Sequence, residues 1–184
     1  DEIIRTIDRA AGDSRIPITV FKITGIGRFA LLEKLDAKEV LTAAEEAEFA
    51  KVRARCEKIC RTAYEKNVPI MVDAEESWIQ NTIDELALDM MRLFNREKLL
   101  VYNTYQMYRH DKLADMKADH LIARETGFIL GVKMVRGAYM EKERKRASEM
   151  GYPSPIQPDK AASDKDYNAS LVYCVENIQE IGFV

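Results

Sequence analysis

The alternation of short apolar runs with longer helical patterns is the feature that most constrains how this chain can fold. Four runs are rich in apolar and β-branched residues, as buried strands are, and with the turn or polar residues that close them they cover 16–27, 68–76, 99–106 and 128–139. A segment with helical periodicity follows each run, and this order is typical of βαβ units with a parallel sheet. The runs are nearly continuous in apolar character, which predicts a sheet covered on both faces.

The segments outside these runs include several predicted helices. The expected helices cover 1–11, 28–66, 77–95, 112–126, 140–150 and 166–181. Thr42, with acidic residues in the turn after it, is a candidate helix start within the second of these segments. Gly127 and Gly151 stand where glycine commonly ends a helix. The apolar residues 183–184 are a candidate start of one further strand.

The composition excludes several classes of protein. With 47% hydrophobic and 32% charged residues, the chain has the make-up of a soluble globular domain. The net charge of -3 provides no basic field, so nucleic acid is not an expected partner. No apolar run reaches the length of a membrane span. The 3 cysteines are too few for a disulfide scaffold and the 2 histidines lack metal-ligand spacing, so we expect a reducing compartment and no metal.

Two architectures fit the alternation, an open doubly wound sheet and a (β/α)8 barrel of the TIM type. Polar side chains favour the barrel, because they gather at or just beyond the carboxyl ends of the predicted strands, at Lys22, Asp73, Asn103 and Lys133. In a barrel these ends form the face on which active sites are built. A complete barrel needs eight strands and about 250 residues. We therefore expect residues 1–184 to be one partial barrel domain, with about the first four βα units and a truncated C-terminal side.

Asp73 follows an apolar strand, where an unpaired carboxylate is costly. Lys22 or Lys133, from other strand ends, could neutralise it, and a structural ion pair explains this pattern as well as a catalytic acid does. Lys22 itself either reaches solvent or faces a polar barrel mouth. At such a mouth it could bind an anion or, with a lowered pKa, form a Schiff base.

Polar residues after two other strands have both a functional and a structural interpretation. The amides of Asn103 and Gln106 suit hydrogen bonding to the edge of a heterocycle, but they also suit capping of a strand end. Glu75 is placed for the start of the next helix, where acidic residues complement the helix dipole.

The end of the fourth strand carries two cations, a glycine and an aromatic ring. Strand alternation places Lys133 and Val135 on one face and Arg136 on the other, so the two cations need not converge. Gly137 allows the backbone to approach a ligand, and Tyr139 can stack on a flat ring. The alternative is a charged strand end with a core tyrosine.

Four blocks of the sequence together resemble the proline dehydrogenase family, the flavoenzymes of proline catabolism. The blocks are VFKITGIGR (20–28), IMVDAEES (70–77), VYNTYQ (101–106) and VKMVRGAYMEKERKRA (132–147). They occur in the family's order and at its spacing, and residues 151–174 resemble the segment that follows. Singly each block is weak, but four in register over most of the chain are specific.

The resemblance implies a distorted (β/α)8 barrel that binds FAD at the carboxyl ends of its strands. It also implies oxidation of L-proline to Δ1-pyrroline-5-carboxylate, with electrons passed to a membrane quinone. The implied location is cytoplasmic, with peripheral contact at the inner membrane, which is the matrix side of a mitochondrion in a eukaryote.

The resemblance assigns roles by position. Lys22 resembles the family's first-strand lysine, which helps to hold the substrate carboxylate, and Asp73 resembles the second-strand aspartate that organises the substrate site. Tyr139 matches the aromatic wall of the proline site, and Asn103 falls where the family places an amide that contacts the flavin. The positions that match the flavin-lining part of the fourth strand are Lys133, Val135, Gly137 and Ala138.

Two departures from the family pattern stand out. Many bacterial members have an arginine beside flavin N5 where this chain has Lys133, a single-point cation typical of the eukaryotic-type branch. The family's later strands, with paired arginines for the proline carboxylate, are expected beyond Val184. The chain therefore resembles the first half of an enzyme, and we expect weak or no turnover from it alone.

Two other functions fit the residues without the resemblance. An aldolase-type barrel would use Lys22 or Lys133 as its Schiff-base lysine, and borohydride trapping with a carbonyl substrate would reveal it. A half-barrel without activity would serve as an assembly module and associate through its open sheet edge. That module would be colourless and inactive.

Overall fold

The computed structural model describes residues 2–184 and shows an α/β fold built on one parallel sheet. The sheet has 5 strands, which lie in chain order, each paired with the next. The strands are β1 (Thr19–Phe21), β2 (Ile70–Val72), β3 (Val101–Gln106), β4 (Leu130–Val135) and β5 (Ile181–Phe183). The helices are α1 (Glu2–Ala10), α2 (Phe29–Asp36), α3 (Ala43–Glu65), α4 (Ser77–Phe94), α5 (Lys112–Thr126), α6 (Met140–Met150) and α7 (Lys160–Glu176), with a 3-10 turn η1 (Ile23–Gly25) after β1.

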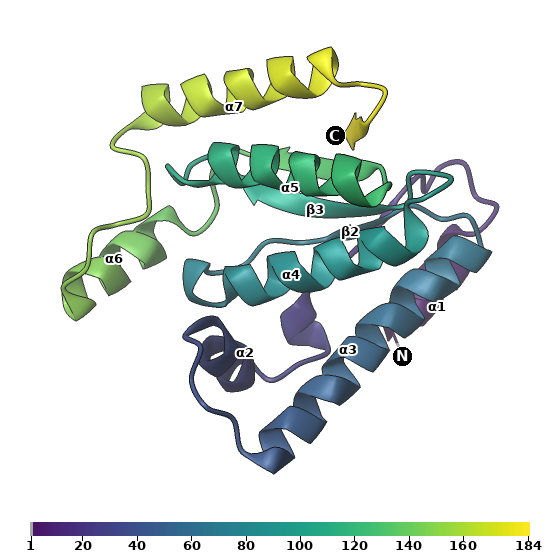
Figure 1. The fold of residues 1–184 in the computed structure, drawn as a ribbon, viewed down its shortest axis with the longest axis horizontal. Helices are drawn as coiled ribbons and strands as arrows, with labels where there is room; N and C mark the ends of the chain where they lie inside the picture. The colour runs from purple at the N-terminus through teal and green to yellow at the C-terminus, as the bar shows by residue number, and fades with distance from the viewer. Residues whose placement is uncertain (1) are drawn as a thin grey trace.

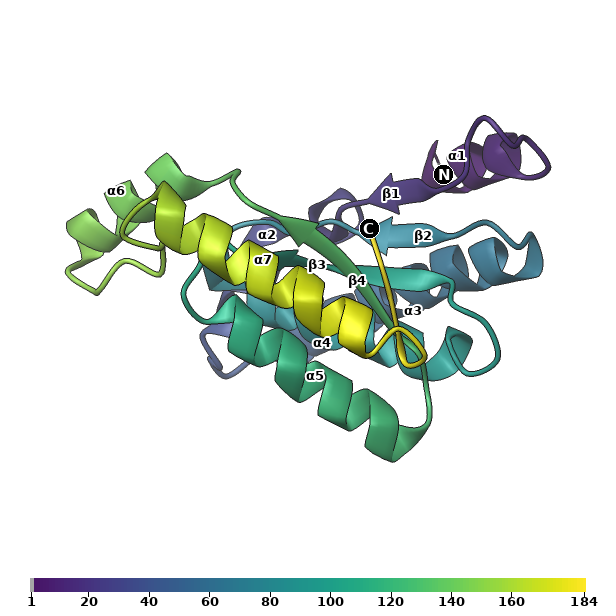
Figure 2. The same ribbon diagram turned by 90° about the horizontal axis from the view of Figure 1, so that it is seen from above.

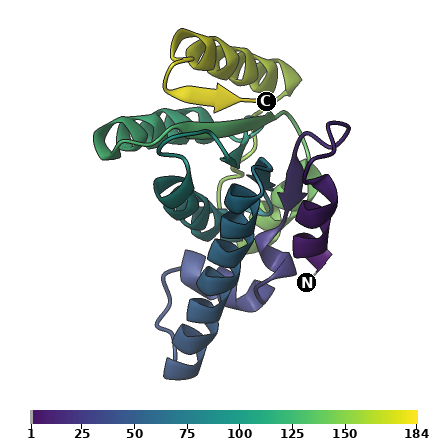
Figure 3. The same ribbon diagram turned by 90° about the vertical axis from the view of Figure 1, so that its right-hand side faces the viewer.

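The helices form a layer along the sheet. α4 packs on β3, α5 packs on β3 and β4, and α7 packs on β4 and β5, with α4 and α5 drawn in front of the strands in Figure 1. α5 and α7 run side by side, which Figure 2 shows from above. In Figure 3, β1 and α1 lie at one edge of the sheet and β5 with α7 at the other. None of the described helices is long and apolar enough to cross a membrane.

The two faces of the sheet differ in burial. The side chains that alternate toward the helices are closed off from solvent, and Ile70, Val101 and Leu130 are each 0% exposed. On the opposite face, Val20 is 52% exposed and Tyr102 is only half-buried. Thr104 on this second face is nevertheless 2% exposed, so, within the described residues, the expectation of two covered faces is correct for the helix-facing side and for only part of the other.

The observed elements agree with the predicted alternation, but the last helix begins six residues earlier and ends five residues earlier than predicted, as α7. All four predicted strands are present, and the further strand expected at the end of the chain begins two residues earlier, at Ile181. The predicted helix over 28–66 is instead two helices, because the chain turns between Asp36 and Ala43, with Lys38 at a φ of 56°. Thr42 begins the second helix with a capping box shared with Glu45, as its sequence context predicts.

The strand order favours one of the two predicted architectures. Because β1 to β5 follow one another across the sheet, the described strands lack the order reversal that defines an open doubly wound sheet. The same order brings the carboxyl ends of all five parallel strands to one edge of the sheet. The residues that follow β1, β2 and β4 therefore meet at that edge.

Candidate active site

The strand registers gather four polar side chains into a single row. β3 pairs with β4 so that Thr104 lies opposite Lys133. The ladders of β1, β2 and β3 end one position earlier, and the next residue of each strand continues toward the same face. We call the resulting set the inner row: Lys22, Asp73, Thr104 and Lys133. The row one residue earlier, which faces the helices, consists of Phe21, Val72, Asn103 and Val132.

Asp73 and Lys133 form an ion pair across the end of the sheet. The Lys133 Nζ atom lies 2.6 Å from Asp73 Oδ1, and the two side chains are 24% and 29% exposed. The prediction that a lysine from another strand end neutralises Asp73 is confirmed, and Lys133 is that lysine. A pair this exposed contributes about 0–1 kcal/mol to folding, so stability alone gives little reason for it.

Lys22 and Tyr139 form the second contact of this region. The Lys22 ammonium donates to the Tyr139 hydroxyl at 2.9 Å and lies 5.6 Å from the centre of its ring. This hydrogen bond raises the pKa of Lys22, the partial burial of the ammonium opposes the rise, and the charges of Glu75 and Asp73 add to it. Lys22 is consequently a protonated cation at neutral pH.

The remaining residues predicted after β4 lie on the segment between the inner row and α6. Val135 is half-buried at the strand end, and Gly137 and Ala138 are exposed. Arg136 points away from them toward α7, where its guanidinium is 3.2 Å from Asp164 and 4.7 Å from the ring centre of Tyr167. The prediction that Lys133 and Arg136 face opposite sides is confirmed.

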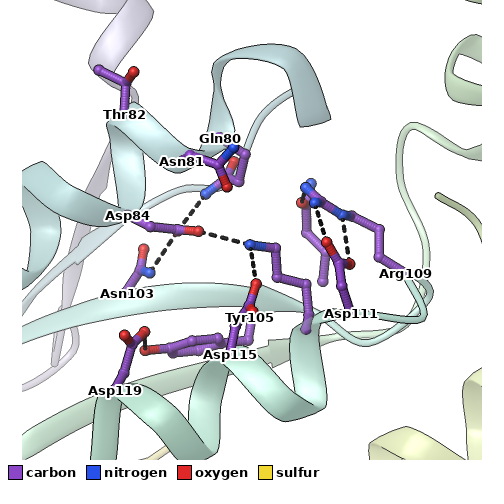
Figure 4. Close-up of polar contacts among 12 residues, drawn as sticks. Gln80, Asn81, Thr82, Asp84, Asn103, Tyr105, Arg109, Asp111, Asp115 and Asp119 are labelled. Atoms are coloured by element: carbon purple, nitrogen blue, oxygen red, sulfur yellow. Dashed lines mark hydrogen bonds and ion pairs between the residues drawn. The ribbon is translucent and has the colours of Figure 1, made fainter. Parts of the chain in front are cut away.

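The position of Asn103 contradicts the role expected for it. Its side chain lies in the helix-facing row, is 0% exposed, and donates to Asp84 Oδ1 of α4 at 2.8 Å (Figure 4). The inner row, which includes Lys133, lies on the other side of the sheet, because adjacent strand residues point to opposite faces. Asn103 therefore belongs to a buried network in the helix layer, on the face opposite Lys133, and this position does not support the flavin contact expected for it.

That network is built around Asp84. Asp84 accepts from Lys112 at 2.9 Å and from Gln80 at 2.7 Å, and Lys112 also donates to Asp115 at 2.8 Å. The Lys112 side chain is 2% exposed, so its charge is compensated by the two carboxylates rather than by water. Figure 4 shows these contacts between α4, α5 and β3.

Gln106 is the amide of β3 that lies on the same face as the inner row. It pairs in register with Val135, two residues beyond Thr104, and is 1% exposed. Its Nε2 donates to the Glu75 carbonyl at 2.6 Å and to the Tyr108 hydroxyl at 2.9 Å. The alternation rule that separates Lys133 from Arg136 also separates Gln106 from Asn103, and the register between β3 and β4 places Gln106 on the face of the inner row.

His120 and the three cysteines are buried, whereas His110 is exposed. His120 is buried between the Tyr173 hydroxyl and the Glu180 carboxylate, at 2.8 Å from each. Cys56 and Cys60 are buried on α3. Among residues 2–184, no group of three or more His, Cys, Asp or Glu side chains is arranged to hold a metal ion.

Comparison with known proteins gives a consistent family. The sequence model described as proline dehydrogenase matches residues 2–184. Human mitochondrial proline dehydrogenase 1 is 36% identical over 167 residues, which are 91% of this chain and 28% of that protein. The Drosophila melanogaster protein of the same name is 38% identical over 73% of this chain and 20% of that protein.

A solved structure shares the fold. Proline utilization A from Bdellovibrio bacteriovorus, in a crystal structure described as inactivated by N-propargylglycine, superposes with a TM-score of 0.82 at 21% identity. The match covers 99% of this chain and 20% of that one. The chain spans less than a third of the length of each of these three proteins.

Proposed function

Because this chain belongs to the proline dehydrogenase family, we propose that it is the part of an oxidoreductase that oxidises L-proline to Δ1-pyrroline-5-carboxylate. The observation that carries the proposal is the inner row, in which Lys22, Asp73 and Lys133 meet at one edge of the sheet beside Tyr139. These are the positions that the family resemblance assigns to substrate and cofactor.

We propose that residues 1–184 are one domain, the first part of a (β/α)8 barrel. The sequential parallel strands and the single helix-covered face support this proposal, since a barrel has helices outside and side chains inside. The exposed inner residue Val20 would then pack against side chains from the strands that complete the barrel. The carboxyl ends of β1, β2 and β4 would line its mouth.

The residues at the end of β4 and just after it fit the FAD that the family uses. Lys133 presents a cation on the inner face, Val135 presents an apolar side chain two residues later, and Gly137 and Ala138 leave backbone exposed for a flat ring system. We propose that these four residues hold the flavin, with Gln106 in place of Asn103 as the nearby amide. Bound FAD supplies the acceptor of two electrons that oxidation of an amine requires, because lysine, aspartate and tyrosine side chains do not accept electrons.

The residues near the end of β1 fit a small amino acid with a carboxylate. The protonated Lys22 offers a point charge for the carboxylate of proline, and Tyr139 offers an aromatic surface for its apolar ring. Asp73 is held by Lys133 and lies in the inner row between Lys22 and Lys133. We propose that Asp73 orients the amine of the bound proline. Conversion of neutral proline to its cyclic imine removes two electrons and two protons in total.

The route of the electrons beyond the flavin is a further proposal. We propose a membrane quinone as acceptor, with the enzyme peripheral at the inner membrane. The curated relatives carry mitochondrial names, which supports the matrix side of that membrane if the source is eukaryotic.

The Schiff-base alternative receives no support from the lysines. An imine-forming lysine must be neutral, whereas the Tyr139 hydroxyl raises the pKa of Lys22. Lys133 is engaged by the Asp73 carboxylate. Both lysines therefore resemble binding groups rather than nucleophiles.

Steady-state kinetics of the full-length, flavin-loaded protein test the proposal. L-Proline should reduce an artificial electron-accepting dye in a saturable way, and borohydride with a carbonyl substrate should leave no label on Lys22 or Lys133. Dye reduction that does not depend on proline would exclude the proposed activity, and a borohydride-trapped lysine would establish the alternative.

A further inference from the structure

Glu75 joins three elements of the fold at the carboxyl end of the sheet. It is 4% exposed and lies two residues after Asp73, in the segment between β2 and α4. Its side chain, its backbone N–H and its backbone carbonyl each bind a different element. No sequence pattern marks this arrangement, because an acid at a helix start is common.

The carboxylate of Glu75 holds the turn that follows β1. Glu75 Oε1 accepts from the backbone N–H of Thr24 at 3.1 Å, and Oε2 accepts from the Thr24 hydroxyl at 2.5 Å. Thr24 lies in the turn η1, two residues after Lys22. The bond therefore ties the segment that carries Lys22 to the segment that carries Asp73.

The backbone of Glu75 is fixed from two further directions. Its N–H donates to Gln80 Oε1 at 2.7 Å, and its carbonyl accepts from Gln106 Nε2 at 2.6 Å. Gln80 in turn donates to Asp84, which is held by the buried Lys112. The N–H and the carbonyl of Glu75 are thus both hydrogen-bonded, which fixes the position of its carboxylate. Because these bonds come from α4 and β3, both elements resist small movements of Thr24.

We propose that Glu75 is a positioning residue, which sets the spacing of Lys22 and Asp73 by clamping Thr24. This inference rests on the proposed function, because it concerns how the proposed substrate contacts are aligned. The Lys22 side chain is exposed, and its ammonium has one hydrogen-bond partner among the described residues, Tyr139. Its backbone carbonyl accepts from the Gly25 N–H of η1, so an anchor on η1 also holds the backbone from which the Lys22 side chain extends. The clamp acts through its hydrogen bonds, and Glu75 itself has no contact with the proposed substrate.

Three variants of the full-length holoenzyme separate hydrogen bonding from charge. Glu75→Gln keeps one acceptor for the Thr24 N–H and offers an amide donor to the Thr24 hydroxyl oxygen, so both bonds survive without the charge. Glu75→Met removes both bonds at similar volume. Thr24→Val removes the hydroxyl and keeps the shape of the side chain.

The expected readout is a change in KM with little change in kcat. A lysine that binds a carboxylate equally in ground and transition state affects KM alone when it is displaced. We expect Glu75→Met and Thr24→Val each to raise the KM for L-proline about tenfold, with kcat within about threefold of wild type. The double variant should match the worse single variant, because both break one clamp. Glu75→Gln should stay within about threefold of the wild-type KM.

Glu76→Met is the matched control. Glu76 is a buried glutamate next in the chain, 6% exposed, and its carboxylate pairs with Lys142 of α6. Its loss should lower the thermal midpoint without changing the KM for proline. If Glu75 acted in folding alone, Glu75→Met would behave in the same way: its thermal midpoint and flavin content would fall, and its KM for proline would not change.

Each result decides one question. If the wild-type enzyme does not oxidise proline, the proposed function is wrong. The clamp is then tested by structures of the variants, in which Lys22 should be displaced from Asp73 in Glu75→Met and not in Glu75→Gln. An active wild-type enzyme with an unchanged KM in Thr24→Val and Glu75→Met overturns the clamp. If Glu75→Gln raises the KM as much as Glu75→Met, the charge of Glu75 matters and the positioning role is wrong. Should Glu75→Met not fold, Thr24→Val alone decides.

Discussion

The Lys133 ammonium lies 2.6 Å from the Asp73 carboxylate, and this contact links the ends of β4 and β2 across the intervening strand β3. Both side chains remain about a quarter exposed, at 24% and 29%. Surface ion pairs of this kind add little to stability. The alignment of Lys133 and Asp73 with Lys22 and Thr104 in the inner row supports the proposed binding site.

Lys133→Met should slow flavin reduction much more than Arg136→Met. Lys133 is on the inner face with the proposed flavin-lining residues, whereas Arg136 is bound to Asp164 of α7. Removal of a cation that favours electron density on the flavin is expected to cost roughly 10²-fold or more in the reduction rate. Stopped-flow absorbance of the full-length enzyme measures it.

Each variant is the control for the other, because Lys133 and Arg136 are cations only three residues apart and both are replaced by methionine. We expect Arg136→Met to stay within about threefold of the wild-type reduction rate and to lower the thermal midpoint modestly, since its ion pair is exposed. Equal slowing by the two substitutions would show that the face assignment of β4 is incorrect.

Lys112→Met should destabilise the fold strongly. The substitution leaves Asp84, whose side chain is 17% exposed, with amide donors only. Removing one partner of a fully buried ion pair typically costs about 3–5 kcal/mol, and we expect about 2–3 kcal/mol here because water reaches Asp84. Chemical denaturation of the full-length protein measures the change in unfolding free energy. Lys117→Met, at an exposed position of the same helix, is the control; it removes only a surface cation–π contact with Tyr173 and should change the unfolding free energy by less than about 1 kcal/mol. Similar values for the two variants would mean that the buried network is dispensable.

Asp119→Asn should stabilise the protein above pH 6. Burial raises the pKa of the Asp119 carboxyl to about 6, while the hydrogen bond from Tyr105 opposes the rise. The folded state then binds the proton more tightly than the unfolded chain, so this group's contribution to stability falls as pH rises from about 4 to about 6. Asparagine removes that loss, and we expect a gain of about 1–2 kcal/mol at pH 7.

The pH dependence provides the control for this prediction. At pH 4 the wild-type carboxyl is protonated in the folded state, so Asp119→Asn and wild type should unfold at closely similar temperatures. Thermal midpoints collected between pH 4 and pH 7 should diverge steadily. A constant difference over the whole range would assign the effect to packing rather than to ionisation.

The order and type of the secondary-structure elements could be predicted from the sequence because they depend on local patterns. The apolar runs specify β1 to β4, and the capping box at Thr42 specifies the start of α3. The break between Asp36 and Ala43 lacks such a marker at its start, because charged residues continue through it without glycine or proline. Lys38 takes a positive φ there, a conformation that lysine rarely signals in a sequence.

Residues of the candidate site could be predicted from the sequence where it was enough to know that a polar residue lies at a strand end. Asp73, Lys22 and Lys133 follow apolar strands, and their meeting needs only parallel strands in sequence. The choice between Asn103 and Gln106 required the register between β3 and β4, because both amides lie near the same strand end. A position-by-position resemblance does not report which face of the strand a side chain takes.

The role of Glu75 depends on contacts that no local pattern encodes. Its partners Thr24, Gln80 and Gln106 come from three different elements, and two of them are far from it in sequence. Buried polar groups must find hydrogen-bond partners, but the sequence does not say which ones. Such contacts become visible only once the strands are aligned.

Anaerobic mixing of the purified full-length protein with L-proline tests the central claim most directly. The oxidised flavin absorbance should bleach as proline is added, and Δ1-pyrroline-5-carboxylate should form in a one-to-one ratio with reduced flavin. Asp73→Asn, which weakens the contact with Lys133, should bleach more slowly at the same proline concentration. A flavin that is bound but keeps its oxidised spectrum in saturating proline would contradict the account.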